Sequence, residues 1–223
     1  WHQHTGKLTV ATDGEPCLSD EFYNHGVAPV RRIRTLCGYH IAATLEHRIR
    51  VIDEDGGYEW RRMRDLKPGD WVVLQKGHFL EPNDYDLPSL VGTPHHNAQR
   101  VHFPTKASGR LGEFIGILIG DGSFSWYNSN GRTGRLILTV ADSQPEVSEW
   151  LVSISRDLFG VSPIAQKKAG DGSTNYFFNV TTLATWLRQL GVEKRSALVA
   201  RVPRIIFRKG KQMACGFLRG LFT

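Results

Sequence analysis

The sequence predicts a two-domain protein in which an all-β module is followed by an α+β domain. Before residue 78, short runs of strand-forming residues are bounded by Gly, Asp and Pro, as in all-β modules. Residues 78–108 hold four prolines and little periodicity, which is typical of an irregular linker. After residue 108, apolar helical patterns alternate with pairs of strands. We therefore expect a first domain at 1–77, a linker at 78–108 and a second domain at 109–223.

The expected elements follow in order. In the first module, strands are predicted at 7–11, 30–35, 39–44, 48–52 and 71–75. The second module predicts the order αββαββα. Its expected strands are 123–127, 135–140, 163–168 and 174–180, and its later helices are 182–190 and 215–223. Between the strand pairs, Ser143 and Glu146 have the spacing of a capping box that would start a helix ending near Gly160.

The central feature of the second module is the apolar run from Phe114, which stops at Asp121 and Gly122. The run is too short to cross a membrane, so we expect a buried helix. The C-terminus of a helix carries partial negative charge, and a carboxylate there is disfavoured unless a cation compensates it. An Asp-Gly pair is also a common turn after a core helix, so the surrounding pattern has to decide between the two interpretations.

Glycines recur every four residues along this helix, at Gly112, Gly116 and Gly120. Residues 215–223 repeat residues 111–119 with Gly216 and Gly220 in register. This long internal repeat suggests a duplicated unit whose two helices pack along their glycines.

These residues resemble the LAGLIDADG homing endonucleases. Gly116, Asp121 and Gly122 match the motif, although Ile119 stands where the family name has its first Asp. In that family two such helices pack together and each delivers one acid to divalent metals. The resemblance makes Asp121 a catalytic and metal-ligating residue, and oxygen ligands suit Mg²⁺. It also implies that a second repeat packs on the Gly112/Gly116 helix.

The family also uses a basic residue ahead of its second motif, commonly a Lys three positions before a Pro. That register falls on Ala200 here, so Arg201 is the candidate to stabilise charge at the scissile phosphate. Lys194 and Arg195 are further candidates. The change to Ala200 leaves open whether such an enzyme is active.

Charge favours a polyanionic partner for the second module. The net charge is +6, with 13 Lys/Arg against 14 Asp/Glu in residues 1–108 and 15 against 8 in residues 109–223. Antiparallel strands can lie in the major groove of double-stranded DNA and present alternate side chains to bases and phosphates. The candidates for DNA contact are Arg135, Lys167, Lys168 and Tyr176, and the alternative for each is a solvated sheet face.

The first module resembles the Hint fold of inteins. Gly38, Thr44 and His47 match one family motif, and the segment from Leu66 to Val72 matches a downstream turn. In that family, the Thr and His polarise the peptide bond before the first intein residue and assist an acyl shift. The resemblance implies flanking host-protein exteins as partners and assigns catalytic roles to Thr44 and His47.

The splicing nucleophile is the weak point of this resemblance. An intein begins with Cys or Ser, whereas Trp1 opens this chain and Cys17 lies too close to Thr44. We expect the nucleophile upstream of Trp1 and a second catalytic acid after Thr223. No signal peptide is visible, and Cys17, Cys37 and Cys215 form no disulfide or metal pattern, so we expect a cytoplasmic protein without membrane contact.

The sequence thus favours an intein fragment with an embedded endonuclease domain, inactive as given in both splicing and cleavage. Two alternatives remain open. One is a non-catalytic DNA-binding module derived from a LAGLIDADG protein, and the other is a free-standing Hint domain with an unrelated insert. Neither the host protein nor the DNA target follows from the sequence.

Overall fold

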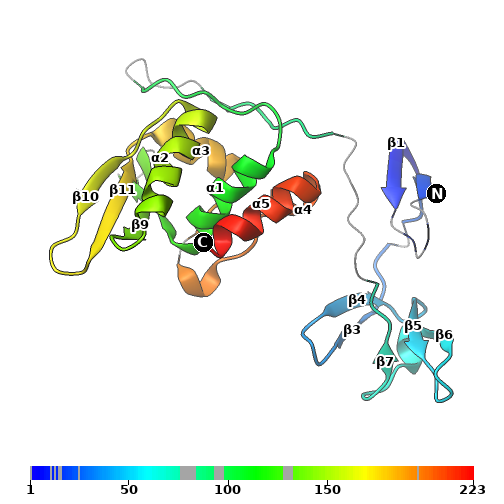
Figure 1. The fold of residues 1–223 in the computed structure, drawn as a ribbon. Coiled ribbons are helices and arrows are strands. Elements are labelled where there is room, and N and C mark those ends of the chain that lie inside the picture. The colour runs from blue at the N-terminus through cyan, green and yellow to red at the C-terminus, as the bar shows by residue number, and fades with distance from the viewer. Residues whose placement is uncertain are drawn as a thin grey trace. The chain divides into compact units, whose positions relative to one another are not determined.

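The structure is a computed structural model that describes residues 2–10, 12, 14, 17–24, 26–75, 84–92, 98–127, 133–194 and 196–223. The chain divides into two compact units, unit 1 from Trp1 to Leu80 and unit 2 from Glu81 to Thr223 (Figure 1). Both contain antiparallel sheets, and the α-helices lie in unit 2 within the described part of the chain. The protein is therefore of mixed α and β structure.

Unit 1 consists of small antiparallel sheets (Figure 1). One hairpin pairs β1 (His2–Val10) with β2 (Cys17–Phe22), and a second pairs β3 (Val30–Arg34) with β4 (His40–Thr44). The third sheet has the order β6-β5-β7, built from β5 (Arg48–Ile52), β6 (Tyr58–Arg62) and β7 (Trp71–Val72). A short 3-10 turn, η1 (Met63–Asp65), follows β6.

The core of unit 1 is small. Val51, Met63 and Leu66 are its buried residues, with Ile33 and Ile49 among the side chains that pack on them. Three of the strands expected from the sequence agree with β3, β4 and β5 to within one residue at each end. The strands β2 and β6 were not predicted, and the strand expected at 71–75 is only two residues long.

Unit 2 begins with the helix–strand–strand pattern that the sequence predicts. Helix α1 (Gly109–Gly120) is followed by β8 (Gly122–Tyr127), β9 (Thr133–Ala141) and α2 (Pro145–Phe159). The chain continues through β10 (Ile164–Lys167), β11 (Ser173–Phe178), α3 (Thr181–Gln189), η2 (Ala197–Val199), α4 (Arg204–Arg208) and α5 (Lys211–Leu221). The strands form one antiparallel sheet of order β10-β11-β9-β8.

Helix α1 lies at the centre of the core of unit 2. Phe114 is fully buried and its ring centroid lies 5.0 Å from that of Phe159 in α2 and 5.9 Å from that of Phe178 in β11. From β9, Leu136 and Leu138 enter the same core. The helices therefore cover one face of the four-stranded sheet.

The start of α2 differs from the prediction. The residue before the helix is Gln144, and no side chain caps the helix there, so the capping box of Ser143 and Glu146 is wrong. Pro145 instead occupies the first turn, where its fixed φ and missing N–H are tolerated. The helix ends at Gly160, whose φ of 66° is the left-handed conformation that glycine adopts readily.

The segment predicted as a linker packs onto unit 2. Within its described residues it contains no helix or multi-residue strand, but Leu87 is buried and Phe103 packs against the core. The indole N–H of Trp186 donates to the backbone oxygen of Pro88 at 2.9 Å. Unit 2 thus starts near Glu81, ahead of the boundary expected at residue 109. No helix in the described part of the chain has the length and hydropathy needed to span a membrane.

Candidate nucleic-acid interface and its carboxylate

Helices α1 and α5 approach each other through glycines. A Cβ placed on Gly112 or Gly116 would lie 2.2 Å from a backbone oxygen of α5, that of Met213 or Phe217. A Cβ on Gly216 or Gly220 would lie 2.0 Å from a backbone oxygen of α1. Real Cβ atoms do not come this close, so the contact requires glycine on both helices. All four glycines that the sequence predicts to line a helix–helix contact therefore lie in the contact of α1 with α5.

One ion pair joins α5 to α1, and a second joins α1 to α2. Arg219 of α5 binds Glu113 of α1 with an N–O distance of 2.7 Å. Arg110 of α1 binds Asp157 of α2, also at 2.7 Å. The side chains of Arg110 and Asp157 are 52% and 55% exposed, so their pair contributes little to stability, on the order of 0.2–1 kcal/mol. The close backbone packing, together with the buried side chains of Met213 and Phe217, holds α5 on α1.

Asp121 lies directly at the end of α1. Its backbone N–H donates to the backbone oxygen of Ile117 at 2.8 Å, which completes the last turn, and its side chain is exposed. The helix thus delivers a carboxylate to the surface at its negative end, where such a group is disfavoured without a cation.

A cation is present at this end of α1. The ammonium of Lys194, which is half-buried, donates to the backbone oxygen of Gly120 at 2.5 Å. Lys194 follows α3 in the chain, so a residue from a distant segment stabilises the C-terminus of α1. Arg201, predicted as the basic partner, is exposed between η2 and α4. Arg195 lies outside the described residues.

The described residues supply few ligands for a metal ion. Asp121 offers one exposed carboxylate, and no group of three His, Cys, Asp or Glu side chains gathers to hold a metal ion among the described residues. Mg²⁺ prefers six oxygen ligands and is commonly held by one or two carboxylates plus water and phosphate. The described residues alone therefore do not make a complete magnesium site.

The face of the four-stranded sheet that turns away from the helices is polar. Strand register places Ser125 opposite Arg135, and Gln166 opposite Asn175, which is opposite Thr139. The Thr139 hydroxyl donates to Asn175 Oδ1 at 2.8 Å. We call this the outer face of the sheet. Its strand residues include no carboxylate: Ser123, Ser125, Tyr127, Thr133, Arg135, Ile137, Thr139, Ala141, Ile164, Gln166, Ser173, Asn175 and Phe177.

Arg135 is held on this outer face by aromatic rings. Its guanidinium carbon lies 4.7 Å from the ring centroid of Tyr127 and 5.1 Å from that of Phe177. The buried Nε of Arg135 has no hydrogen-bond partner in the described part of the chain. Two cation–π contacts therefore orient this charge on the outer face.

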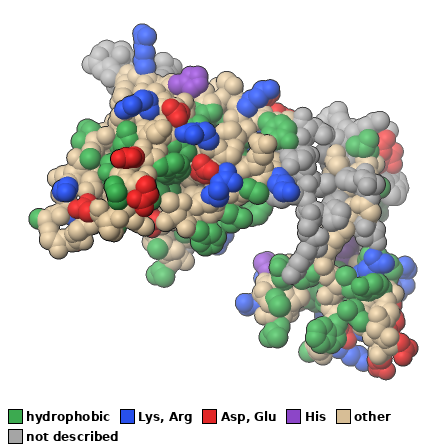
Figure 2. Space-filling view, viewed as in Figure 1, with side chains coloured by type: hydrophobic (Ala, Val, Ile, Leu, Met, Phe, Trp, Pro, Cys, Tyr) green, Lys and Arg blue, Asp and Glu red, His purple; other side chains and the backbone are tan. Residues whose placement is uncertain are grey.

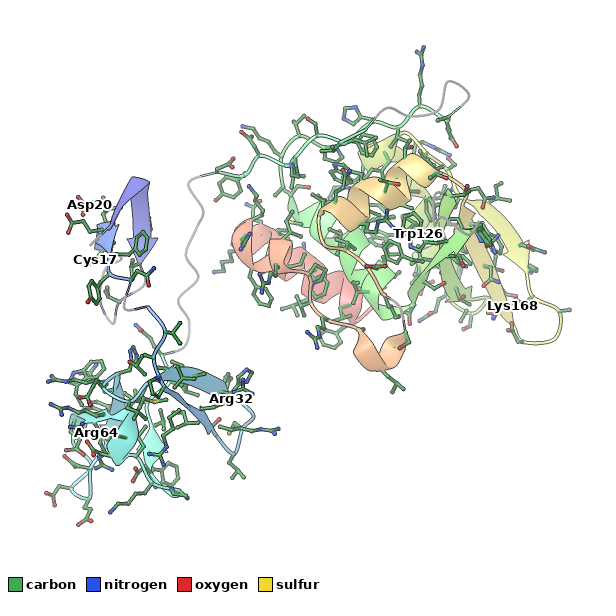
Figure 3. All side chains as sticks on the ribbon, turned by 180° about the vertical axis from the view of Figure 1, so that it is seen from behind. Cys17, Asp20, Arg32, Arg64, Trp126 and Lys168 are labelled. Carbon is green, nitrogen blue, oxygen red and sulfur yellow. The ribbon has the colours of Figure 1, made fainter. Side chains whose placement is uncertain are left out.

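Two of the four predicted contact residues share the outer face. Arg135 lies on this face because it pairs with Ser125. Lys168 follows the last residue of β10, beside the turn of the β10–β11 hairpin, and the alternation of side chains along β10 places it on the same face (Figure 3). Lys168 also pairs with Asp171 across that turn at 3.0 Å. Figure 2 shows Lys and Arg side chains spread over the visible face of unit 2 rather than gathered in one cluster.

The other two predicted residues, Tyr176 and Lys167, do not lie on the outer face. Tyr176 pairs with Leu138, is only 9% exposed and belongs to the helix-facing core. Lys167 pairs with Thr174, so it lies on the same side as Tyr176, at the edge, where it approaches Asp142 at 3.7 Å. They lie on the other face because side chains alternate in a strand, so a shift of one residue decides the face. The same alternation places Gln166 and Asn175 on the outer face, and the sequence pattern alone did not select these two residues.

In unit 1, Thr44 and His47 lie on one tight turn. Thr44 ends β4 and is half-buried, while His47 is exposed just before β5. The His47 N–H donates to the Thr44 backbone oxygen at 3.0 Å, and the His47 backbone oxygen accepts from the N–H of Met63 at 2.8 Å. The turn is therefore fixed on both sides. Cys17 is exposed at the start of β2, in the β1–β2 hairpin.

The turn before β7 is closed by Asp70. One carboxylate oxygen accepts from the Lys67 backbone N–H at 2.7 Å, and the other binds Arg61 at 2.9 Å. The Lys67 N–H and then Arg61 favour the charged form and hold the pKa of Asp70 below its usual value, although partial burial opposes the shift. Arg61 also binds Glu59, so one guanidinium joins β6 to this turn.

Comparison with known proteins gives distant relatives whose names refer to replication or to DNA. No known family profile matches the chain. The chain is 20% identical to the replication factor C small subunit of Methanocaldococcus jannaschii over 191 residues, which are 86% of the chain and 9% of that protein. It is 27% identical to the replicative DNA helicase DnaB of Rhodothermus marinus over 205 residues, 89% of the chain and 18% of that protein.

A shorter segment of the chain is similar in sequence to a third kind of protein. It is 30% identical to a DNA gyrase subunit of Mycolicibacterium flavescens over 66 residues, 28% of the chain and 12% of that protein. The chain thus spans less than a fifth of the length of each of these relatives.

Proposed function

We propose that the chain is part of an intein that carries a LAGLIDADG-type homing endonuclease. Unit 2 binds duplex DNA and delivers Asp121 to the scissile phosphate, and unit 1 is the Hint-like splicing module. The observation that carries the proposal is the glycine contact of α1 with α5, since it ends at an exposed carboxylate beside a sheet with a polar outer face.

The pattern of relatives supports an inserted element. Nearly the whole chain aligns with a small part of a replication factor and a small part of a helicase, and a shorter stretch aligns with a gyrase subunit. These relatives are named for different activities, yet each contains a segment similar to this chain. A segment that recurs inside otherwise different proteins behaves as a separable unit, and an intein is such a unit.

The outer face of the sheet is suited to duplex DNA. Side chains on one face of a strand repeat every second residue, and a two-stranded ribbon fits the major groove. Asn175 and Gln166 carry amides that can read base edges, and Arg135 and Lys168 supply charge for bases or phosphates. The absence of carboxylates from the described strands of this face removes repulsion of the DNA backbone.

At the end of α1, Asp121 supplies a carboxylate and Lys194 supplies an ammonium group. Asp121 offers an oxygen ligand, and Lys194 holds the helix end in place while adding positive charge near it. Mg²⁺, when bound, would stabilise charge on the attacking and leaving oxygens of phosphodiester hydrolysis. Because no group of three potential metal ligands gathers among the described residues, we expect a further acid from outside them to complete the site for cleavage.

In unit 1, we assign Thr44 and His47 to activation of a peptide bond. Thr44 can donate a hydrogen bond from its hydroxyl, and His47 can transfer a proton near neutral pH. Their common turn is anchored to η1 through the N–H of Met63, which keeps both side chains on one short segment. The exteins would be the protein segments on either side of the intein.

The test uses a DNA substrate made from the gene that encodes this chain. The intein-coding segment is deleted, so that the flanking coding sequences meet at an uninterrupted junction. A homing endonuclease recognises the uninterrupted junction and ignores the interrupted copy. We expect the protein to protect the junction in a footprinting assay, and binding is the primary readout because the described residues do not form a complete metal site. Equal affinity for the junction and for random duplex DNA would overturn the proposal.

The second candidate is a non-catalytic DNA-binding module of the same descent, which the alanine at position 200 favours. The same assay separates it from the endonuclease. Protection of the junction by the complete natural protein, without Mg²⁺-dependent cutting, would assign binding alone.

A further inference from the structure

The β6-β5-β7 sheet of unit 1 turns a set of aromatic rings toward solvent. Register places Trp60 opposite Arg50, and both Tyr58 and Trp71 opposite Ile52. These residues therefore lie on the side of the sheet away from the core residue Val51. We call Arg50, Tyr58, Trp60 and Trp71 the aromatic face of unit 1.

The rings of this face are strongly exposed. The exposed fractions are 67% for Tyr58, 60% for Trp60 and 75% for Trp71. Figure 2 shows hydrophobic side chains at the visible surface of unit 1, with Lys and Arg among them. Exposed apolar surface of this kind, gathered on one sheet, marks a binding site more often than a solvated face.

An arginine is stacked among the rings. The guanidinium carbon of Arg50 lies 5.2 Å from the ring centroid of Tyr58 and 5.6 Å from that of Trp60. These cation–π contacts keep its positive charge at the surface of the face. The rings and the charge are thus presented together.

The face borders a groove with a volume of about 820 Å³. Besides Arg50, Tyr58 and Trp60, its wall includes Tyr39 and Arg48, and no described residue of the wall is a carboxylate. A groove with two arginines, three aromatic rings and no acid is complementary to an anion that carries flat rings.

We propose that this groove and the aromatic face bind single-stranded nucleic acid. Unpaired bases stack on exposed aromatic rings, and the arginines neutralise the phosphates, which is the general mode of single-strand recognition. The rings cannot stack on the bases of a duplex, because those bases already stack on each other. An acidic peptide would satisfy the arginines but would leave the rings without flat partners.

This site is separate from the outer face of the sheet in unit 2. It does not depend on the proposed contact of that face with duplex DNA, so either can fail without the other. Its ligand is defined by chemistry, as an unpaired polynucleotide strand of any sequence, because stacking is tolerant of sequence.

The experiment measures binding of fluorescein-labelled dT12 to the whole chain by anisotropy, with excess unlabelled duplex present to occupy unit 2. We expect Tyr58→Ala and Trp60→Ala each to weaken binding roughly ten-fold, as loss of one stacking ring does. Trp60→Phe should keep most of the affinity. Arg50→Gln should weaken binding and reduce the salt slope by about 0.7, as for one phosphate contact on a single strand.

The matched control is Tyr23→Ala, which removes an aromatic ring of unit 1 that is 58% exposed and lies outside the face. It should bind dT12 as the unchanged protein does. The inference is overturned if Trp60→Ala binds dT12 unchanged, or if an oligoglutamate peptide binds and dT12 does not. A large fall in the thermal midpoint of unit 1 in Trp60→Ala would also overturn it, since the ring would then support the fold.

Discussion

A Cβ on Gly116 would lie 2.2 Å from the backbone oxygen of Phe217, so the two helices touch backbone to backbone at this point. Atoms at that separation overlap, and neither backbone can move without opening the buried contact of α1 with α5. The position is therefore closed to every residue except glycine.

We expect Gly116→Ala to destabilise unit 2 by about 1–3 kcal/mol or more, which is the cost of overpacking a dense interior. The added methyl meets backbone of α5, which cannot rotate away as a flexible side chain would. Urea unfolding, followed by far-UV circular dichroism, measures the change.

The matched control is Gly109→Ala, also in α1. Its Cβ would lie 3.4 Å from the nearest atom, the backbone oxygen of Gln212, which is ordinary contact. Alanine is the better helix former, so this change should be neutral or stabilise slightly. Similar losses of stability in both variants would contradict the close approach of α1 and α5.

The second prediction compares neighbouring lysines on opposite sides of the sheet. Lys168→Gln should lower the affinity for duplex DNA and reduce the magnitude of the salt slope by about 0.9, as loss of one phosphate contact does. Lys167→Gln should change both much less, because Lys167 lies on the helix-facing side near Asp142. Filter binding at several salt concentrations measures both variants, and equal slopes would argue against DNA contact through the outer face.

The sequence predicted the order of helices and strands in unit 2 well, because its signals are local. Glycines every four residues marked the α1 face, and alternating apolar residues marked β9. The face of the sheet on which Tyr176 and Lys167 lie was not predictable in the same way. Which side of β10 and β11 meets the helices depends on pairing with β9, and a shift of one residue exchanges the two faces.

Other features depended on contacts between distant segments. The bond from Lys194 to Gly120 joins residues 74 positions apart in the sequence, and no local pattern at either residue predicts it. The proline-rich segment was interpreted as a linker because proline interrupts helices and strands, yet irregular backbone can still pack. Leu87 and Phe103 are apolar residues of this segment that do so.

The third prediction concerns acid stability of unit 1. Asp70 has a lowered pKa because it accepts from the Lys67 N–H and binds Arg61. Its folded pKa lies below its unfolded value, so its contribution is complete above the unfolded value of about 3.9 and is lost as pH falls through the folded pKa. We expect Asp70→Asn to remove part of the stability of unit 1 at neutral pH and to flatten its decline in acid.

Carbon-13 NMR of the Asp70 carboxyl measures this pKa directly. Arg61→Gln should raise it toward the ordinary value without reaching it, because the Lys67 N–H bond remains. An unchanged midpoint in Arg61→Gln would show that Arg61 does not contribute to the shift.

The fourth prediction tests the cation at the end of α1. Lys194→Met removes the charged donor from the Gly120 oxygen and should destabilise unit 2 by about 1–2 kcal/mol. Lys167→Met is the control, because the Lys167 side chain is 80% exposed and only approaches Asp142, at 3.7 Å. Calorimetric unfolding measures both, and an equal or greater loss in the control would contradict a special role of Lys194.

The last prediction concerns Asp121, which is either a metal ligand or only the turn residue after α1. The two interpretations predict opposite effects of Asp121→Asn on DNA cutting. Lys194 binds the backbone oxygen of Gly120, so the Asp121 charge at the helix C-terminus is still unfavourable, and Asp121→Asn should stabilise unit 2 by about 0.3–1 kcal/mol. The same change removes the carboxylate that we propose as a metal ligand. In the complete natural protein it should therefore abolish Mg²⁺-dependent cutting of the uninterrupted junction and leave DNA affinity nearly unchanged.

Asp142→Asn serves as the control, since Asp142 accepts from the Thr174 hydroxyl at 2.7 Å and lies in the turn after β9, away from the end of α1. It should cost stability and leave cutting intact. Cleavage is measured on supercoiled plasmid and stability by urea unfolding. If the Asp121→Asn protein cuts as well as the original, Asp121 is only the turn residue that ends α1. The Asn side chain has the same shape as that of Asp but no charge, so the result would show that the charge is not needed.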